Sequence, residues 1–411
     1  MLTLPTEFIE QTLNIYGQKI GQQIIDSLSN SSTLTSLRLN PNLVSVDLDY
    51  ILQDSTSIPW LDSGYYLASR PDFKNDINFQ NGCYYPQESS SMIIAWLTKY
   101  LNSKSSLDLI LDLCAAPGGK TLLLADTLTD SLVISNEVDP WRNQVLQQNI
   151  TKWKSKNIIC TRHKPAEFNH LKDLFDLILV DAPCSGEGMF CKDPDSIAHW
   201  SPKNVEICQS RQKQILYDIF ASLKVGGYII YSTCTLNTQE NEDVINWLTS
   251  TLPCKLEIIG DLPEDANHQF VQLQEGCYHL IPPFSKGEGL FFAVIRKTEN
   301  WEHEVDEQEQ EIWKRLKGRK TANDYFQKQK LAKHTFLEEK KQEVILKIKE
   351  TYPDLDLERF ALICQNSLDY FLFPRDFVNI LPQIQNLKVT RWAISLGQMR
   401  SRDIRTWKPI K

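Results

Sequence analysis

Three apolar runs, each ending in a polar turn rich in glycine, proline or cysteine, constrain the fold of this chain more than any other feature of its sequence. The runs are residues 107–113, 175–181 and 226–232, and their turns contain CAAPGGKT (114–121), DAPCSGEG (181–188) and STCTL (232–236). Such runs fit strands of a parallel sheet that is buried on both faces. The carboxyl ends of these strands build one ligand site in an open α/β sheet. The pattern therefore predicts an α/β fold whose three turns meet.

The turn after the first run has the features of a cradle for a nucleotide-containing cofactor. Gly118 and Gly119 let the backbone approach a ligand closely, and residues 120–128 are predicted to form a helix whose amino end faces that ligand. The next run, residues 132–139, ends in acids, and a carboxylate at this place commonly binds ribose hydroxyls. Glu137 is the predicted ribose contact, although either acid could cap the helix that follows Pro140. For Asp139 we favour the cap.

Longer strings around these turns resemble those of RNA cytosine-5 methyltransferases of the Nop/Sun family. The matching strings are CAAPGGKT (114–121), DAPCSGEGMF (181–190), STCTL (232–236), YYPQESSSM (84–92) and GEGLFFAVIRK (287–297). They occur in the family's order and extend over roughly residues 1–297. Within the family, SLRLNP (36–41) and the extra C-terminal segment are most similar to the bacterial RsmF type, which modifies 16S rRNA.

The resemblance implies the fold, the cofactor and the partner. We expect an α/β, Rossmann-like S-adenosylmethionine-dependent methyltransferase sheet with a small N-terminal RNA-binding region and a C-terminal accessory module. The implied cofactor is S-adenosyl-L-methionine, and the implied partner is RNA, with 16S rRNA or the small ribosomal subunit expected first. A tRNA-directed member of the family would share every catalytic residue. A protein of another class, an inactive RNA-binding or ribosome assembly factor, would keep the fold, although the intact cysteines weigh against it.

The resemblance also assigns roles to individual residues. Cys234 is implied to be the thiolate that adds to carbon 6 of cytosine, which turns carbon 5 into a nucleophile for the methyl group. Cys184 is implied to assist the later elimination and product release, and Asp181 to hydrogen-bond the ring. Lys120 is predicted to orient the base or keep a thiol ionised, unless it is merely solvated. The predicted cofactor-binding residues are Cys114, Ala115, Ala116, Pro117, Gly118, Gly119, Lys120, Glu137 and Asp181.

Cysteine usage separates two thiols from the other eight of the ten in the chain. A free cysteine is most often buried and inert, but Cys184 and Cys234 stand beside Pro, Ser and Thr at strand ends, which favours reactivity. Cys114 is expected to contribute backbone and shape only. No C-x-x-C pair is present, so no metal site is predicted. The amino terminus lacks a secretory pattern and no run is long enough for a membrane helix, so reduced thiols in the cytoplasm are expected. The sequence does not indicate the oligomeric state.

Charge and composition divide the chain into four predicted regions. The net charge of −8 does not indicate a nucleic-acid-binding protein, so RNA binding would require a local basic surface. We expect an N-terminal RNA-binding region (1–100), a catalytic domain (101–298), a charged linker with a basic helical segment (299–350) and an accessory module (351–411). Residues 314–349 are the predicted phosphate contact, and aromatic residues of the N-terminal region could stack on bases. Residues 387–397 resemble the start of the family's small β-rich RNA-binding module, which we expect to be incomplete here.

Two further segments carry open alternatives. The QESS segment (87–90) is predicted either to approach the target base or to cap a helix. Lys164 stands where the family usually has an acid or amide directed at the adenine. Either another residue binds the adenine amino group, or cofactor affinity is reduced. A DNA cytosine methyltransferase is disfavoured because its Glu-Asn-Val motif is absent.

Overall fold

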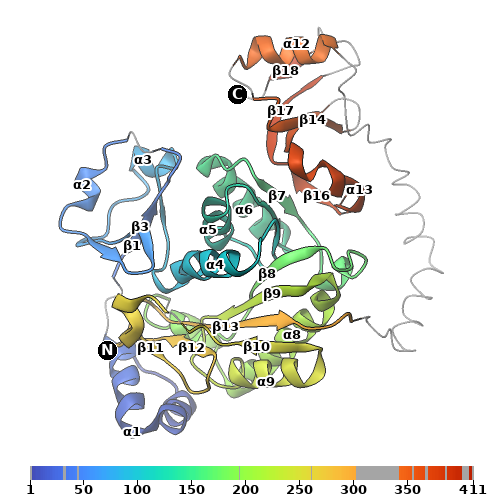
Figure 1. Ribbon diagram of the computed structural model, residues 1–411. Coiled ribbons are helices and arrows are strands. Elements are labelled where there is room, and N and C mark those ends of the chain that lie inside the picture. Colours follow the sequence, from blue (N-terminus) through green and yellow to red (C-terminus); the bar gives the residue numbers. More distant parts are fainter. Residues whose placement is uncertain are drawn as a thin grey trace. The chain divides into compact units, whose positions relative to one another are not determined.

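The computed structural model describes residues 2–30, 34–43, 46–193, 195–260, 262–301, 342–353, 356–365, 369–384, 387–399 and 407–409 (Figure 1). These residues belong to two compact units, one formed by Met1–Ser155 with Arg162–Trp301 and the other by Lys156–Thr161 with Glu302–Lys411. Most of the basic stretch predicted at 314–349 lies outside the described residues. The boundaries predicted for the four regions stay predictions.

A mixed sheet forms the centre of the first unit. Its strand order is β11-β12-β13-β9-β8-β5-β6, and β10 pairs with β13. The pairs β5–β6, β5–β8 and β8–β9 are parallel, and β13 runs antiparallel to β9. The strands are β5 (Leu109–Asp112), β6 (Leu132–Asn136), β8 (Phe175–Asp181), β9 (Leu223–Thr233), β10 (Cys254–Glu257), β11 (Phe270–Val271), β12 (Cys277–Leu280) and β13 (Leu290–Lys297).

The three apolar runs of the sequence form the adjacent strands β5, β8 and β9, which confirms the predicted parallel arrangement. Most of their residues are buried, as expected for strands covered on both faces. Helices α4, α5 and α6 lie on one face of the sheet, and α8 and α9 lie on the other (Figure 1). These helices are α4 (Ile93–Lys104), α5 (Gly119–Thr127), α6 (Pro140–Trp153), α8 (Pro202–Ile219) and α9 (Glu242–Thr251).

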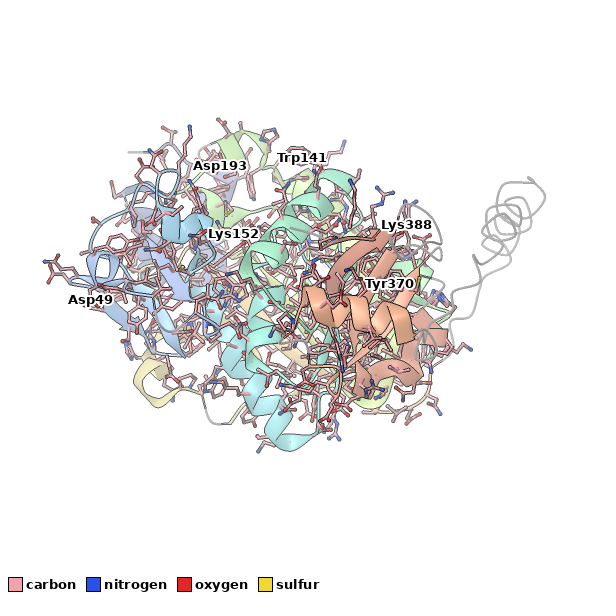
Figure 2. The ribbon with its side chains drawn as sticks, turned by 90° about the horizontal axis from the view of Figure 1, so that it is seen from above. Asp49, Trp141, Lys152, Asp193, Tyr370 and Lys388 are labelled. Carbon is pink, nitrogen blue, oxygen red and sulfur yellow. The ribbon has the colours of Figure 1, made fainter. Side chains whose placement is uncertain are left out.

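Helix α6 begins as the sequence predicts. The carboxylate of Asp139 accepts a hydrogen bond from the Arg142 backbone amide at 2.8 Å, and Pro140 occupies the first helical position. This confirms Asp139 as the cap, because the cap satisfies an amide that has no partner inside the helix. Trp141 and Lys152 lie near the two ends of this helix (Figure 2).

The amino-terminal part combines a helix with a small antiparallel sheet of order β2-β3-β1-β4. Helix α1 covers the predicted stretch and is interrupted at Gly17, whose φ of 74° is not helical. Its apolar face packs against Phe190, Trp200 and Leu236, so it covers segments that follow the two cysteine turns. The elements are α1 (Thr6–Asn30), β1 (Ser36–Leu39), α2 (Asp49–Leu52), β2 (Thr56–Ile58), β3 (Leu61–Tyr66), α3 (Ile77–Gln80), β4 (Tyr84–Pro86) and, later in the chain, α7 (Asp195–His199).

The second unit contains a four-stranded antiparallel sheet of order β14-β15-β17-β18 and the antiparallel pair β7–β16. Helix α12 packs its buried Ile348 into a cluster with Tyr370 and Leu372. The elements are β7 (Ile158–Thr161), α12 (Gln342–Thr351), β14 (Phe360–Gln365), β15 (Asp369–Pro374), α13 (Leu381–Ile384), β16 (Val389–Arg391), β17 (Ile394–Met399) and β18 (Trp407–Pro409). Across the described ranges of both units, no helix combines the length and the apolar character needed to cross a membrane.

A buried arginine joins the small sheet to the large one. Arg38 of β1 is 1% exposed, and its Nη1 lies 2.6 Å from Oδ2 of Asp126 on α5. Its Nε donates to Gln87 Oε1 at 2.9 Å, and its guanidinium lies 4.3 Å from the ring centroid of Trp153 on α6. Trp153 Nε1 in turn donates to the same Asp126 carboxylate. A buried ion pair of this kind fixes the relative placement of its elements, because removing either partner leaves an uncompensated charge.

We predict that Arg38→Met lowers the free energy of unfolding by about 3–5 kcal/mol, since Asp126 keeps its charge without its cation. Denaturant unfolding of the full chain measures this change. Lys99→Met, at an exposed position of α4, serves as the control and should shift the free energy by less than about 0.5 kcal/mol. Equal effects of the two variants would contradict the proposed role of Arg38.

Candidate active site

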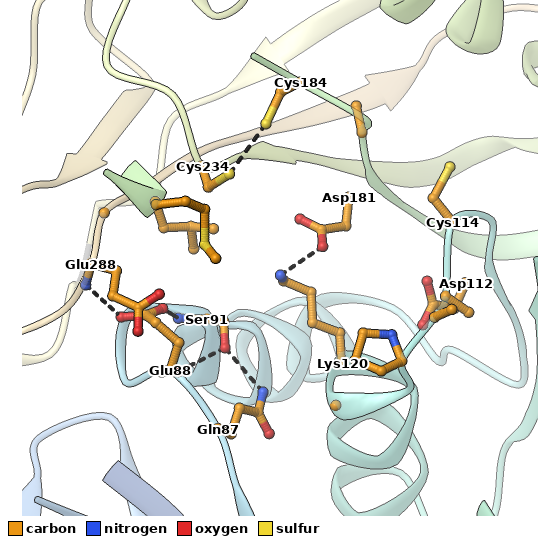
Figure 3. A pocket seen from close by; sticks show the side chains of 18 of the residues that line it. Gln87, Glu88, Ser91, Asp112, Cys114, Lys120, Asp181, Cys184, Cys234 and Glu288 are labelled. Atoms are coloured by element: carbon orange, nitrogen blue, oxygen red, sulfur yellow. Dashed lines mark hydrogen bonds and ion pairs between the residues drawn. The ribbon is translucent and has the colours of Figure 1, made fainter. Parts of the chain in front are cut away.

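A cavity of about 340 Å³ opens at the carboxyl ends of β5, β8 and β9. All three sequence-predicted turns contribute to its wall, which confirms that they meet at one place (Figure 3). The lining residues are Tyr85, Pro86, Gln87, Glu88, Ser91, Asp112, Cys114, Ala115, Ala116, Pro117, Gly119, Lys120, Asp181, Ala182, Cys184, Met189, Lys192, Cys234, Glu288, Gly289 and Leu290.

The two predicted thiols lie side by side in the wall of this cavity. The Sγ atoms of Cys184 and Cys234 are 3.2 Å apart (Figure 3). The hydrogen bond with Cys234, together with burial, raises the pKa of Cys184 well above its ordinary value. Cys184 is therefore a protonated thiol, and its S–H can donate a hydrogen bond to the sulfur of Cys234. The arrangement places this thiol in contact with the second sulfur.

Lys120 reaches from the first turn of α5 to the end of β8. Its Nζ lies 2.8 Å from Asp181 Oδ2, and the Ser232 hydroxyl donates to Asp181 Oδ1 at 2.8 Å. Burial alone would lower the pKa of Lys120, but the charge and hydrogen bond of Asp181, with the charges of Glu88 and Cys234, raise it. The side chain is only 16% exposed. Lys120 is therefore a fixed ammonium in the cavity wall, and the alternative of a merely solvated lysine was wrong.

The predicted cofactor loop is held by neighbouring elements. Arg142 Nη2 donates to Ala116 O, and Asn149 Nδ2 donates to Pro117 O, both at 2.8 Å. Gly118 has a φ of 112°, a conformation that residues with a side chain rarely adopt. Burial raises the pKa of Cys114, so it stays a neutral thiol, as its predicted role in backbone and shape requires.

Asp112 is a cavity residue that our sequence reasoning missed. It is fully buried, and Thr121 Oγ1 donates to its Oδ2 at 2.6 Å. Its Oδ1 has no hydrogen-bond partner among the described residues. Burial raises the pKa of this carboxyl to about 7. An unpartnered buried oxygen beside a cavity suits a ligand that brings a donor or a positive charge. The only sequence signal was its place next to the last residue of an apolar run.

Glu137 does not line the cavity. It is 3% exposed, its Oε1 accepts a hydrogen bond from the Asp139 amide at 2.9 Å, and its Oε2 lies 3.5 Å from Arg142 Nη1. Its ribose contact stays a prediction. Lys164 is exposed, and its backbone amide donates to Glu167 Oε2 at 2.7 Å. Its side chain is not part of the cavity lining.

The QESS segment (87–90) caps a helix, which is one of the two roles predicted for it from the sequence. The carboxylate of Glu88 accepts hydrogen bonds from the amides of Ser90 and Ser91, both at 2.8 Å, at the start of η1 (Ser90–Met92). It also accepts one from the Glu288 amide at 2.9 Å. Because Gln87 and Glu88 line the cavity as well, the cap sits in its wall.

Known proteins resemble this chain over its first three hundred residues. Residues 4–89 match the N-terminal domain of 16S rRNA methyltransferase RsmF, and residues 99–296 match the family described as 16S rRNA methyltransferase RsmB/F. Ribosomal RNA small subunit methyltransferase F of Pectobacterium carotovorum is 33% identical over 308 residues, which cover 72% of this chain and 63% of that protein. The protein of the same name from Escherichia coli O157:H7 is 36% identical over 253 residues, or 59% of this chain and 52% of that protein. The chain thus spans about half to two thirds of the length of these relatives.

Solved structures show the same fold. The crystal structure of NSun6 from Pyrococcus horikoshii with SFG has a TM-score of 0.61 at 19% identity, covering 72% of this chain and 98% of that one. A methyltransferase homolog protein from Pyrococcus horikoshii has a TM-score of 0.57 at 24% identity, covering 70% and 93% of the two chains. At these identities the likeness establishes the Rossmann-like fold alone.

The pKa of Asp112 predicts a pH dependence of stability. The folded chain holds the Asp112 proton up to about pH 7, whereas the unfolded chain releases it near pH 4. Between these values the folded state binds more protons, so stability falls as the pH rises through this window. Asp112→Asn has no carboxyl to ionise and should not show this loss. The stability of the variant minus that of the wild-type chain should therefore be larger at pH 8 than at pH 4, by at most roughly 4 kcal/mol. Unfolding of both proteins from pH 4 to 8, without added ligand, measures the difference.

Asp108→Asn provides the matched control, because Asp108 is exposed and stands just before the same strand. Its stability curve should run parallel to that of the wild-type chain. If the Asp112→Asn curve is parallel as well, Asp112 is ionised in the folded state and the predicted burial cost is absent.

Proposed function

The chain belongs to the RsmB/F family of 16S rRNA methyltransferases, and we propose that it transfers a methyl group from S-adenosylmethionine to carbon 5 of a cytosine in 16S rRNA. The observation that carries this proposal is the pair of sulfur atoms 3.2 Å apart, in a cavity that the glycine-rich loop also lines. A chemistry in which one thiol attacks the base and the other assists its release needs both beside the same base, and this geometry supplies both. An rRNA substrate would place the protein in the cytoplasm.

The first step is attack by Cys234. Its thiolate adds to carbon 6 of the ring, a new S–C bond forms, and the electrons of the C5–C6 double bond make carbon 5 nucleophilic. S-adenosylmethionine, when bound, supplies an electrophilic methyl group. Asp181 and Lys120, which are paired at 2.8 Å, face the cavity where the base would lie. Together they offer a hydrogen-bond acceptor and a fixed positive charge to balance charge that develops on the ring.

The second step releases the product. The proton on carbon 5 passes to water, the double bond re-forms, and the S–C6 bond breaks with its electron pair returning to Cys234. Cys184 carries the proton in the thiol pair, so its S–H can donate a hydrogen bond to the leaving thiolate. This gives Cys184 a role in expulsion and leaves attack to Cys234.

The residues around the loop fit the proposed cofactor. The backbone of residues 114–119 approaches the cavity without bulky side chains, and the unpartnered Oδ1 of Asp112 offers an acceptor to a cationic group. Glu137 remains our candidate for the ribose hydroxyls. It lies directly after β6, one residue beyond Asn136.

Three cations near the cavity offer a surface for RNA phosphates. Lys192 lies 2.9 Å from Glu288 in the cavity wall. Lys286 stands two residues before Glu288, with its Nζ 5.1 Å from the ring centroid of Tyr66. Burial and the charge of Glu88 raise the pKa of Glu288, and the charges of Lys192 and Arg70 oppose this shift. Arg70, Lys192 and Lys286 are exposed and come from three separate loops. In an acidic chain, such a rim attracts a polyanion where the reaction occurs.

Replacement of each cysteine should have a different effect on methylation and on the covalent adduct with RNA. Cys234→Ala should abolish both methylation and covalent attachment to RNA, because the ring is never activated. Cys184→Ala should still attack but release product slowly, and a protein–RNA adduct should survive denaturing electrophoresis. Transfer of labelled methyl groups to 16S rRNA and assembled small subunits, followed by bisulfite sequencing, measures the reaction.

The same assay tests the substrate. A tRNA pool incubated in parallel serves as the comparison, and methylation of tRNA alone would move the substrate from rRNA to tRNA. An adduct that accumulates with Cys234→Ala and not with Cys184→Ala would reverse the two roles. If the wild-type chain methylates none of these RNAs, the proposed activity is wrong.

Replacing the three rim cations should weaken RNA binding. The triple variant of Arg70, Lys192 and Lys286 to Ala should bind RNA with a shallower dependence on salt, by about 0.7 in slope for each lost phosphate contact to a single strand. Fluorescence anisotropy over a range of salt concentrations measures the slope.

The control is the triple variant of Lys99, Lys203 and Lys255 to Ala, which removes the same net charge from exposed positions outside the cavity lining. Its slope should stay close to that of the wild-type chain. Equal slopes for both triple variants would show that only net charge matters and that the rim has no special role.

A further inference from the structure

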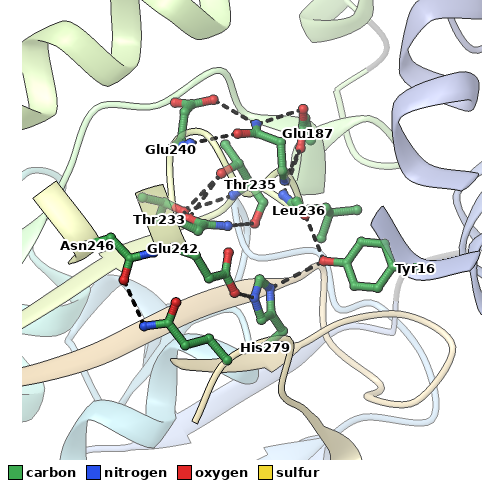
Figure 4. Close-up of polar contacts among 12 residues, drawn as sticks. Tyr16, Glu187, Thr233, Thr235, Leu236, Glu240, Glu242, Asn246 and His279 are labelled. Carbon is green, nitrogen blue, oxygen red and sulfur yellow. Dashed lines mark hydrogen bonds and ion pairs between the residues drawn. The ribbon is translucent and has the colours of Figure 1, made fainter. Parts of the chain in front are cut away.

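Two buried carboxylates share one asparagine beside the cysteine turns. Asn237 Nδ2 donates to Glu187 Oε1 at 2.9 Å and to Glu240 Oε1 at 3.0 Å. Figure 4 shows Glu187 and Glu240 near one another. The Glu240 amide donates back to Asn237 Oδ1 at 2.8 Å. Glu187 and Glu240 are fully buried. Both hydrogens of the amide are therefore used, and the three side chains form one connected group.

Each carboxylate binds the cysteine turn to which it does not belong. Glu187 follows Cys184 in sequence, yet its Oε2 accepts from the amides of Leu236 and Asn237, at 2.7 and 3.0 Å, just after Cys234. Glu240 follows Cys234, yet both its oxygens accept from the amide of Ser185, at 3.0 and 3.3 Å, next to Cys184. The two turns are thus cross-braced, and neither can move without breaking bonds of the other.

The donors to Glu240 are all neutral N–H groups. Besides Ser185 and Asn237, Gln212 Nε2 on α8 donates to Oε2 at 2.7 Å. No cation forms an ion pair with Glu187 or Glu240 in the described part of the chain. Burial raises the pKa of Glu240, and the hydrogen bonds from Ser185, Asn237 and Gln212 oppose this shift. Since every partner donates, the ionised form of Glu240 is the one that fits these bonds. A negative charge supported only by dipoles acts strongly on its neighbours in a medium of low polarity.

That charge acts on the thiol of Cys184. After the hydrogen bond of Cys234 and burial, Glu240 is a further cause of the raised pKa of Cys184. Lys120, by contrast, interacts with Cys234. The ionisable groups around the thiol pair are Tyr231 from β9, Glu240 from the turn before α9, Cys208 and Arg211 from α8, Glu187 from η3 (Glu187–Met189), and the Lys120–Asp181 pair.

We propose that Glu240 is a positioning residue that holds the Cys184 turn through Ser185 and keeps the proton on Cys184, which leaves Cys234, on the side of Lys120, as the attacking thiol. The catalytic consequence rests on the proposed methyl transfer. The assignment of the proton does not, because it concerns only groups of the free chain. An experiment can therefore contradict the proposed methyl transfer without contradicting the assignment of the proton to Cys184, and the reverse.

Alkylation of the full chain with iodoacetamide, read separately for each cysteine by peptide mass spectrometry from pH 6 to 10, tests the proposal. In the wild-type chain, labelling of Cys184 should rise at a higher pH than labelling of the same cysteine in the urea-unfolded chain. In Glu240→Gln, labelling of Cys184 at pH 7.5 should become roughly 10-fold faster, because a negative charge that opposes ionisation of the thiol is removed. The amide of this variant can be accommodated, because Gln212 Oε1 has no partner among the described residues and can accept its new N–H.

Glu187→Gln is the matched control, because it removes an equally buried charge from the same asparagine. The main causes that raise the pKa of Cys184 are Cys234, burial and Glu240, and Glu187 bonds to the turn of Cys234 instead, so the labelling profile of Cys184 should move far less than in Glu240→Gln. An equal shift in both variants would show general loosening of the turns and overturn the proposal. An unchanged Cys184 profile in Glu240→Gln would overturn it as well.

The wild-type chain and Cys234→Ala keep the test decisive if Glu240→Gln does not fold. Labelling of Cys184 at the same pH in the folded and in the urea-unfolded wild-type chain would contradict the proposal directly. In Cys234→Ala the partner sulfur is gone but Glu240 remains, so Cys184 should still be labelled at a higher pH than the same cysteine in the urea-unfolded chain. Equal profiles in these two states would show that Glu240 does not hold the proton. A chain that shows the expected labelling but methylates no RNA would lose the proposed function and keep this assignment.

Discussion

The parallel pairing of β8 with β9 is the constraint on which the rest of the site depends. Asp181 lies opposite Ser232 in this pairing, and the Ala182 amide donates to Ser232 O at 2.9 Å beyond the last paired residues. The two chains leave the sheet side by side, and the Gly188 amide donates to Cys234 O at 2.8 Å. A shift of register by one residue would turn the side chains to opposite faces. The two sulfurs would then no longer meet.

Local patterns in the sequence were sufficient to predict the parallel strands of the sheet and the turns that form the cavity. Apolar runs, glycine pairs and a proline after an acid report on backbone conformation within a few residues, and they correctly predicted β5, β8, β9, the helix after the glycine pair and the cap at Asp139. The position of Lys120 was predicted, but its pairing with Asp181 was not. That pairing depends on two strands being neighbours, which residue spacing alone does not determine.

Buried polar groups were the part that could not be predicted. Arg38 pairs with Asp126, and Glu187 bonds to Asn237, across long stretches of chain. Nothing in the flanking residues distinguishes these side chains from exposed ones, because charged residues are mostly exposed. Their partners become visible only in the folded chain, where each buried polar group must find a donor or acceptor. Asp112 was missed for the same reason, and the predicted phosphate contact at 314–349 lies largely outside the described residues.

The buried Arg38 limits how freely parts of this protein could be exchanged with relatives. Residues 4–89 match a sequence domain of their own, yet the guanidinium within that segment is neutralised by Asp126 and covered by Trp153, both of which lie beyond it. A chimera that joined this segment to another catalytic core would bury an arginine without its carboxylate unless the acid and the indole were transplanted too. The segment that sequence comparison identifies as a domain is therefore smaller than the part of the chain that can be transferred with its buried contacts intact.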